Sequence, residues 1–431
     1  MICLDIIYII NETGGNKLKT KENMKTVLMI AIIYINFSLW FLEYSEIVHI
    51  VLTIGIIILY QLFSEKKVKI HKSGLYFVLF MLFLILISCF FNVDFGELNI
   101  SVIIKWIIAL FLISTFTFEE FSETYIKAMK IISIFAIVTF FFQIMAPNII
   151  EMFPTIKTTK WVGEESVNKI HNLFIGVANV QANYKRNCGI FYEPGLLALY
   201  TNLAIFLLMF KSKKLNIKTF ILLNIAVITS FSTNGYISLI LMYVAYFMKK
   251  RNPVKEKRYF EKKYRNYVLG IVMLLAIFTK IFFTNNPKSW NFLTNKLFEL
   301  NGTVTSGSGY ERRRAIELAF DAIYQNPITG LSTDGQAKFF NGAISTFTPL
   351  QWFITYGFIF GFICNICLVC FTIEKKENIF CSMLKLVAFM SMIVSQNMSA
   401  NIFIIAIIIY QACNYIRGRK YDNSNSSNIQ Y

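Results

Sequence analysis

The chain has 431 residues, of which 56% are hydrophobic and only 16% are charged, and its formal net charge is +17. Soluble domains contain about 25% charged residues. This combination excludes a disordered protein, a secreted disulfide scaffold and an ordinary soluble enzyme. Two classes remain: a membrane protein whose basic residues lie in loops, and a basic protein that binds nucleic acid.

About twelve stretches are long and apolar enough to predict membrane-spanning helices, each of which needs roughly 20 apolar residues. The run Val78–Ile87, for example, contains only apolar residues. A stacked helical repeat is the alternative, but the sequence shows no internal repeat. We therefore expect an all-α polytopic membrane protein, a single integral membrane domain with about 12 transmembrane helices, near 26–42, 47–63, 75–92, 101–118, 129–147, 193–210, 217–232, 235–248, 267–284, 350–373, 379–396 and 400–416.

Lysine and arginine are distributed unevenly among the expected loops. The loop at 249–266 is strongly basic, whereas the short loops at 43–46 and 92–97 contain neither residue. Because basic loops stay in the cytoplasm, we expect both termini to be cytoplasmic and two long segments, 148–192 and 285–349, to be external. The same asymmetry accounts for the positive charge without a nucleic-acid partner. Contact with anionic membrane lipids is the simplest role of the basic loop.

The cysteines do not predict a disulfide or a metal site. Cys188 is the only one expected outside, so no exported disulfide is implied. Cys364, Cys367 and Cys370 have a metal-like spacing, but they lie in an apolar span without a nearby histidine or fourth cysteine. They are expected to be small packing residues. No phosphate-binding loop is present either, and we expect no metal or other cofactor.

The first external segment ends in Arg186-Asn-Cys-Gly-Ile-Phe-Tyr-Glu193-Pro194. Pro194 suits the first turn of a helix, so Glu193 is expected at the outer mouth of the sixth span, at the positive end of the helix dipole. One interpretation is a helix cap with an interfacial arginine. The other is a general base, Glu193, beside an anion-binding Arg186.

The second external segment is expected to contain an amphipathic helix at about 309–325. Ser308-Gly-Tyr-Glu311 has the pattern of a capping box, and Pro327 follows the expected end of the helix. On a helical wheel an apolar stripe forms, with Arg312 at its centre; the stripe contains Ile316, Ala319 and Ile323.

Arg312 is thereby expected to face protein or the membrane surface, where an unpaired guanidinium is unfavourable. A phosphate or pyrophosphate would remove this penalty, because arginine binds such oxyanions with two parallel hydrogen bonds. An ion pair with an internal carboxylate such as Glu193 would remove it equally well. His171, in the first external segment, is of a type that titrates near neutral pH; a surface histidine is the simpler interpretation, and contact with substrate is the other.

Three stretches together resemble the bacterial O-antigen and capsular polysaccharide repeat-unit polymerases and the related O-antigen ligases. They are Arg186-x-x-Gly189-x-Phe191-x-Glu193-Pro194, Ser232-Thr-Asn-Gly235-Tyr236, and Ser308 through Pro327-Ile-Thr-Gly330. The resemblance covers most of the chain in topology. In the family pattern an arginine lies about fifteen residues before the proline, which corresponds to Arg312. The ligases tend to carry a histidine at the start of the next span; residues 346–352 contain none, which favours a polymerase.

The resemblance implies a membrane glycosyltransferase at the outer face of the bacterial cytoplasmic membrane. Such an enzyme joins oligosaccharide repeat units carried on undecaprenyl pyrophosphate, in concert with a flippase and a chain-length regulator. Arg312 and Arg186 are then expected to bind the pyrophosphate, and Glu193 to accept the hydroxyl proton. Further substrate-binding candidates are Arg313, Tyr310 and His171.

A flippase for the same lipid-linked oligosaccharides is the main alternative from another class. It would need polar residues along the spans to pass a glycan, and the spans contain few, such as Gln143 and Asn224. A general solute transporter should show internal repeats or interrupted helices, and neither is evident in the sequence. An O-antigen ligase is the nearest enzymatic alternative.

Overall fold

The computed structural model describes residues 17–41, 44–64, 70–156, 170–173, 175–178, 185–212, 215–248, 266, 270, 308–340, 347–373, 377–394 and 396–426. The described residues are about 81% helical, and they include six helices that are long and apolar enough to cross a membrane. Each predicted span that falls within the described residues overlaps a helix. The ninth predicted span, 267–284, and the basic loop at 249–266 lie outside the description except for Asn266 and Gly270.

These observations confirm an all-α protein of membrane-embedded type. The number of spans and their orientation remain predictions. The chain divides into two compact units, residues 1–68 with 119–236, and residues 69–118 with 237–431.

The first unit is built around helix α8, whose side chains are almost all buried. Asn36 of α2 donates to the Thr53 hydroxyl of α3 at 3.0 Å, and Lys25 of α2 pairs with Glu120 of α6 at 2.6 Å. The helices of this unit are α2 (Lys17–Phe37), η1 (Leu39–Phe41), α3 (Glu46–Ser64), α6 (Phe118–Met145), α7 (Pro147–Glu151), α8 (Pro194–Phe206), the π-helical turn η2 (Leu207–Lys211), α9 (Ile217–Thr229) and the start of α10 (Thr233–Met248).

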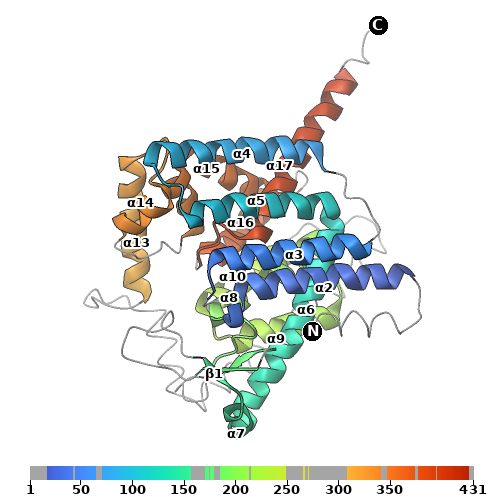
Figure 1. The fold of residues 1–431 in the computed structure, drawn as a ribbon. Coiled ribbons are helices and arrows are strands. Elements are labelled where there is room, and N and C mark those ends of the chain that lie inside the picture. Colours follow the sequence, from blue (N-terminus) through green and yellow to red (C-terminus); the bar gives the residue numbers. More distant parts are fainter. Residues whose placement is uncertain are drawn as a thin grey trace. The chain divides into compact units, whose positions relative to one another are not determined.

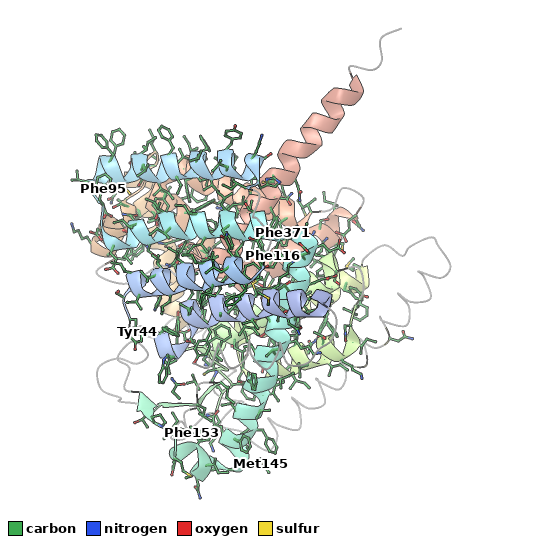
Figure 2. All side chains as sticks on the ribbon, turned by 45° about the vertical axis from the view of Figure 1, so that its right-hand side comes forward. Tyr44, Phe95, Phe116, Met145, Phe153 and Phe371 are labelled. Atoms are coloured by element: carbon green, nitrogen blue, oxygen red, sulfur yellow. The ribbon has the colours of Figure 1, made fainter. Side chains whose placement is uncertain are left out.

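A small antiparallel sheet lies in the predicted first external segment, where the sequence indicated no strands. Its order is β1 (Thr155–Ile156), β2 (Ile170–Asn172) and β3 (Val177–Ala178). Figure 2 shows Phe153, next to this sheet, and Met145 at the end of α6.

The second unit is built around α17, in which residues 402–410 are all buried. This helix packs against α4, α5 and α15, while α13 and α14 both pack against α15 (Figure 1). The helices of this unit are α4 (Lys72–Asn92), α5 (Glu97–Thr115), α13 (Ser308–Gln325), α14 (Ser332–Phe339), α15 (Thr348–Thr372), α16 (Ile379–Val394) and α17 (Ile402–Ser426), together with the rest of α10.

Helix α4 illustrates why these helices suit a bilayer. Its inner face buries Val78, Met81 and Ile85, yet its outer face carries large apolar side chains such as Phe83, which is 58% exposed, and Phe90, which is 71% exposed. A helix that is apolar on all sides is unfavourable in water and favourable in lipid.

Candidate functional site

The start of α8 places Glu193 where the sequence predicted it. Pro194 occupies the first helical position, and Glu193 is the residue immediately before it, with extended backbone (φ −133°, ψ 144°). The Glu193 side chain makes no capping hydrogen bond to the helix. Glu193 is thus the N-cap residue of α8 by position, without a capping bond from its carboxylate, and the charge of that carboxylate acts on Arg186 and Tyr192.

Arg186 is held by two backbone carbonyl groups in the turn after α9. Its Nε donates to the carbonyl oxygen of Ser230 at 3.1 Å, and its Nη2 donates to that of Phe231 at 2.9 Å. Burial lowers the pKa of Arg186, and the negative charge of Glu193 opposes this shift. A guanidinium carries five N–H donors. Within the described part of the chain only these two carbonyls accept from it, so its remaining donors can bind an oxyanion.

The stretch that begins at Arg186 is thus bonded to residues 229–231, directly before the stretch Ser232–Tyr236. Asn187 adds two bonds to Thr229, from its backbone N–H to the carbonyl oxygen at 3.0 Å and from its side-chain amide to the hydroxyl at 2.8 Å. The Tyr236 hydroxyl closes the same turn by donating to the carbonyl oxygen of Ile228 at 2.6 Å. Sequence reasoning missed Asn187, because a single buried amide leaves no periodic signal.

Other members of the first motif serve packing. Gly189 has φ +57°, and a Cβ there would lie 3.0 Å from the Cβ of Ala136. Phe191 is fully buried and stacks on Tyr200 with ring centroids 5.0 Å apart. The spacing of the motif therefore reflects a left-handed turn and an aromatic stack that bring Arg186 and Glu193 near the start of α8.

Cys188 lies between these two polar residues and is buried. Burial raises the pKa of its thiol to about 12, so it stays protonated at neutral pH and is a poor nucleophile. Cys364, Cys367 and Cys370 lie in α15 and are free. In the described part of the chain, no three His, Cys, Asp or Glu side chains form a group that could hold a metal ion.

His171 is not a surface residue, which corrects the simpler sequence interpretation. It lies in the middle of β2, between Thr155 and Ala178 of the neighbouring strands, and is only 6% exposed. Its Nδ1 lies 2.8 Å from the carbonyl oxygen of Phe153. Since a carbonyl only accepts, Nδ1 must carry the proton, and this ring nitrogen is already used within the protein.

The three candidates of the second external segment, Arg312, Arg313 and Tyr310, lie in α13, in a turn whose side chains are outside the description. Further along the helix the predicted amphipathic pattern is present. Ala319 and Ala322 are fully buried, whereas Glu317 and Asp321 are exposed. Position 312 precedes Ala319 by two helical turns, so the backbone places it on the same face.

An unpredicted feature of the second unit is a break in α15. Gly357 has φ +84° and ψ −179°, which interrupts the helix after Tyr356. No interrupted helix was evident in the sequence, so this break was not predicted. The backbone groups freed by the break bond to residues 327–331, directly after α13.

A second unpredicted feature is the carboxylate of Asp94, in the loop between α4 and α5. It is buried and accepts hydrogen bonds from the N–H of Gly96 at 3.1 Å, the N–H of Asp334 at 2.9 Å and the hydroxyl of Thr333 at 3.2 Å. Burial alone would raise the pKa of Asp94, but its hydrogen bonds, which include one from Ser332, outweigh burial and lower it. Its only sequence signal is an acidic residue in a short loop, which is too common to be diagnostic.

Comparison with known proteins found no match to a family model, a curated protein or a solved structure.

Proposed function

We propose that the protein is a membrane glycosyltransferase that polymerises undecaprenyl-pyrophosphate-linked oligosaccharide repeat units into a surface polysaccharide, either O-antigen or capsule. The observation that carries the proposal is the fixed position of Arg186. Its guanidinium is held by the carbonyl groups of Ser230 and Phe231, is influenced by the charge of Glu193, and lies near the start of the apolar helix α8. An arginine and a carboxylate beside an apolar helix suit a substrate with a pyrophosphate, a sugar and a lipid chain.

The proposed reaction needs one bond to form and one to break. A hydroxyl of the acceptor sugar attacks the anomeric carbon of the donor glycan, and the bond from that carbon to the pyrophosphate oxygen breaks. Glu193 accepts the hydroxyl proton. The electron pair leaves on the lipid pyrophosphate, where Arg186 stabilises the growing negative charge through the N–H donors that do not bind Ser230 and Phe231.

Arg312 is proposed separately as a ligand of the pyrophosphate oxygens, on the strength of its place in the motif and on the buried face of α13. Arg313, Tyr310 and His171 are secondary candidates for substrate binding. No metal or cofactor is part of the proposal, since the leaving group is already activated and arginine supplies the positive charge.

The proposed location is the bacterial cytoplasmic membrane, with the reaction on its outer face and both termini in the cytoplasm. The proposed partners are lipid-linked glycans, membrane lipids, a flippase and a chain-length regulator, and no nucleic acid. A reporter enzyme that works only outside the cytoplasm should be active when it is fused within 285–349. If a reporter that works only in the cytoplasm is active there instead, the proposed orientation is wrong.

Deleting the gene and analysing the lipid-linked glycans tests the activity itself. Loss of a polymerase leaves single repeat units on the lipid at the outer face. Full-length polymer stranded on the lipid would instead identify a ligase, and repeat units trapped inside would identify a flippase. Complementation with the wild-type chain, compared with Glu193→Gln, connects the outcome to this protein's own carboxylate.

One observation favours the transporter alternative and so keeps it in the test. Broken helices are common at the substrate sites of transporters, and α15 is broken at Gly357. In this protein, however, backbone groups freed by the break bond to residues 327–331 of the chain itself, which makes the break weak support for transport.

A further inference from the structure

The break in α15 is repaired by another part of the chain. In an unbroken helix the N–H of Phe358 would donate to the carbonyl oxygen of Ile354. Here the Phe358 N–H donates to the carbonyl oxygen of Pro327 at 2.7 Å, and the Ile354 carbonyl accepts from the N–H of Leu331, also at 2.7 Å. The segment 327–331, which we call the splice segment, thus takes over both ends of the lost helical bond.

This exchange has a clear energetic reason. A backbone group without a partner inside a bilayer is strongly unfavourable, so an interrupted span must be completed by protein or water. The carbonyl group of Thr355, next to the break, is satisfied in the same way, since the Ser88 hydroxyl of α4 donates to it at 3.1 Å. The splice segment therefore acts as part of α15.

Two glycines allow the splice segment to approach so closely. A Cβ at Gly357 would lie 1.9 Å from the carbonyl oxygen of Ile328, and a Cβ at Gly330 would lie 2.5 Å from that of Thr355. Both glycines have positive φ, +84° and +69° respectively. Gly330 belongs to the Pro-x-x-Gly stretch of the second external segment. The glycine of this motif is therefore explained by the close packing of the splice segment against α15.

The end of α4 and the loop that follows it also bond to the splice segment and to the start of α14. Asn92 donates its side-chain amide to the carbonyl oxygen of Gly330 at 3.1 Å. Asp94 accepts from the N–H of Asp334 and from the hydroxyl of Thr333, in the first turn of α14. A carboxylate at this position satisfies N–H groups that have no partner within the helix.

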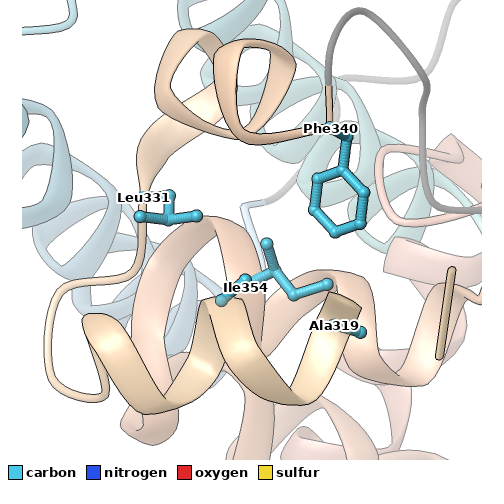
Figure 3. Packing of buried hydrophobic residues seen from close by; sticks show 5 residues of the cluster. Ala319, Leu331, Phe340 and Ile354 are labelled. Atoms are coloured by element: carbon cyan, nitrogen blue, oxygen red, sulfur yellow. The ribbon is translucent and has the colours of Figure 1, made fainter. Parts of the chain in front are cut away.

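Helix α13 is connected to the splice segment and packs against α15. It ends at Gln325, two residues before the splice segment. Its buried residues Ala319 and Ala322 belong to one apolar cluster with Leu331, Phe340 and Ile354. Figure 3 shows the side chain of Ile354 between α13 and Leu331, with Phe340 reaching toward α13 from the end of α14. The backbone that carries Arg312 is therefore tied to α15 through the chain and through packing.

We propose that Asp94 is a positioning residue, which fixes the splice segment in the break of α15 and thereby places α13 so that Arg312 can bind the substrate oxyanion. The substrate role of Arg312 rests on the proposed function. The anchoring of α13 by Asp94 does not, and it can be measured without any substrate.

The first test is amide hydrogen exchange on the full-length protein in lipid nanodiscs. Asp94→Asn removes the charge and turns one acceptor into a donor that faces N–H groups. Exchange over 308–340 should become about tenfold faster or more, since hydrogen bonds to charged groups are the stronger ones. Asp321→Asn is the matched control, because Asp321 is an exposed aspartate of α13 itself. Thr333→Val removes only the hydroxyl that donates to Asp94. This milder variant replaces Asp94→Asn in the test if Asp94→Asn does not fold.

The second test is a double-mutant cycle on polymer formation with Asp94→Asn and Arg312→Lys. If Asp94 acts through Arg312, Asp94→Asn lowers activity in the wild-type background and has little further effect in the Arg312→Lys background. Losses that multiply would overturn the positioning role, as would full activity in Asp94→Asn.

The two tests also separate the two proposals. Unchanged exchange over 308–340 in both Asp94→Asn and Thr333→Val would overturn the anchoring of α13, whatever the protein's activity. If exchange becomes faster but the wild-type protein makes no polymer from lipid-linked repeat units, the anchoring is supported and the polymerase proposal fails.

Discussion

The Nη2 group of Arg186 donates a hydrogen bond of 2.9 Å to the carbonyl oxygen of Phe231. Phe231 has φ +49°, a left-handed conformation that is unusual for a residue other than glycine. Because Arg186 binds this carbonyl and that of Ser230, it stabilises a strained turn between α9 and α10. The same side chain is proposed to bind pyrophosphate, so one residue connects the fold of the first unit to its proposed chemistry.

Arg186→Lys should lower both stability and polymer formation. An ammonium group cannot reach both carbonyls with the planar geometry of a guanidinium, and the loss of one charge-assisted hydrogen bond reduces the free energy of unfolding by about 1–3 kcal/mol. Unfolding in detergent and the length of the polymer made in a deletion strain are the measurements. Lys185→Gln, at the preceding basic residue, is the control. Wild-type stability in Arg186→Lys would show that the two carbonyl bonds contribute little.

Glu193→Gln should separate chemistry from folding. The substitution keeps the size of the side chain and removes only its charge, so stability should change far less than activity, through the lost attraction to the buried Arg186. The rate of glycan transfer should fall by about 10²–10⁴-fold if the carboxylate is the general base. Rates measured with lipid-linked repeat units decide the matter, with Glu151→Gln at the exposed end of α7 as the control. A near-wild-type rate in Glu193→Gln removes it from the mechanism.

Cys188 should make stability depend on alkaline pH. Burial raises the pKa of its thiol to about 12, whereas an unfolded cysteine titrates at about 8.5. The buried thiol therefore favours the folded state below the unfolded pKa, and this contribution is lost as pH rises above it, by up to about 1.4 kcal/mol per pH unit.

The measurement is the free energy of unfolding between about pH 8 and pH 10.5, compared between the wild-type protein and Cys188→Ala. The wild type should lose stability more steeply, because alanine does not titrate. Parallel curves would mean that Cys188 is not buried as a thiol. Alkylation by a maleimide at neutral pH should also be slow until the protein is unfolded.

Much of this structure could be predicted because it is local in sequence. Apolar length alone located the helices, and Pro194 correctly placed Glu193 just before α8. The apolar stripe of Ile316, Ala319 and Ile323 at helical spacing likewise predicted the amphipathic helix α13.

The rest depends on contacts between distant residues, which leave no periodic pattern. Asp94 and Asp334 are 240 positions apart, yet the carboxylate of one binds the N–H of the other. Gly357 lies in an apolar run that reads as a continuous helix, and the break exists because residues 327–331 supply its missing bonds. His171 was expected at the surface, because strands of two or three residues are too short to show an alternating pattern.

Gly357→Ala should be far more harmful than the same change in an ordinary helix. A methyl group at Gly357 would collide with the Ile328 carbonyl oxygen, and the positive φ adds about 1–3 kcal/mol of backbone strain. At Gly55 in α3 a Cβ meets nothing within 4 Å, so Gly55→Ala should be neutral or stabilise the protein by up to about 1 kcal/mol. Thermal unfolding of the two variants makes the comparison. Equal stability would show that α15 can close into an unbroken helix without the splice segment.

Arg312→Lys and Arg314→Lys test whether neighbouring arginines of α13 differ in role. Position 312 lies on the face that carries the buried Ala319, whereas position 314 lies on the same side as the exposed Glu317 and Asp321. A lysine at 312 keeps the charge but loses the two-pronged binding of an oxyanion, so polymer formation should fall by about tenfold or more. Arg314→Lys should keep nearly full activity, because exposed helical ion pairs contribute only about 0.2–0.5 kcal/mol.

Polymer length in a deletion strain, normalised to the amount of protein in the membrane, is the measurement. Full activity in both variants would contradict a specific role for Arg312. An equal loss of activity in both would indicate that arginine is needed on both faces of α13, and not at position 312 alone.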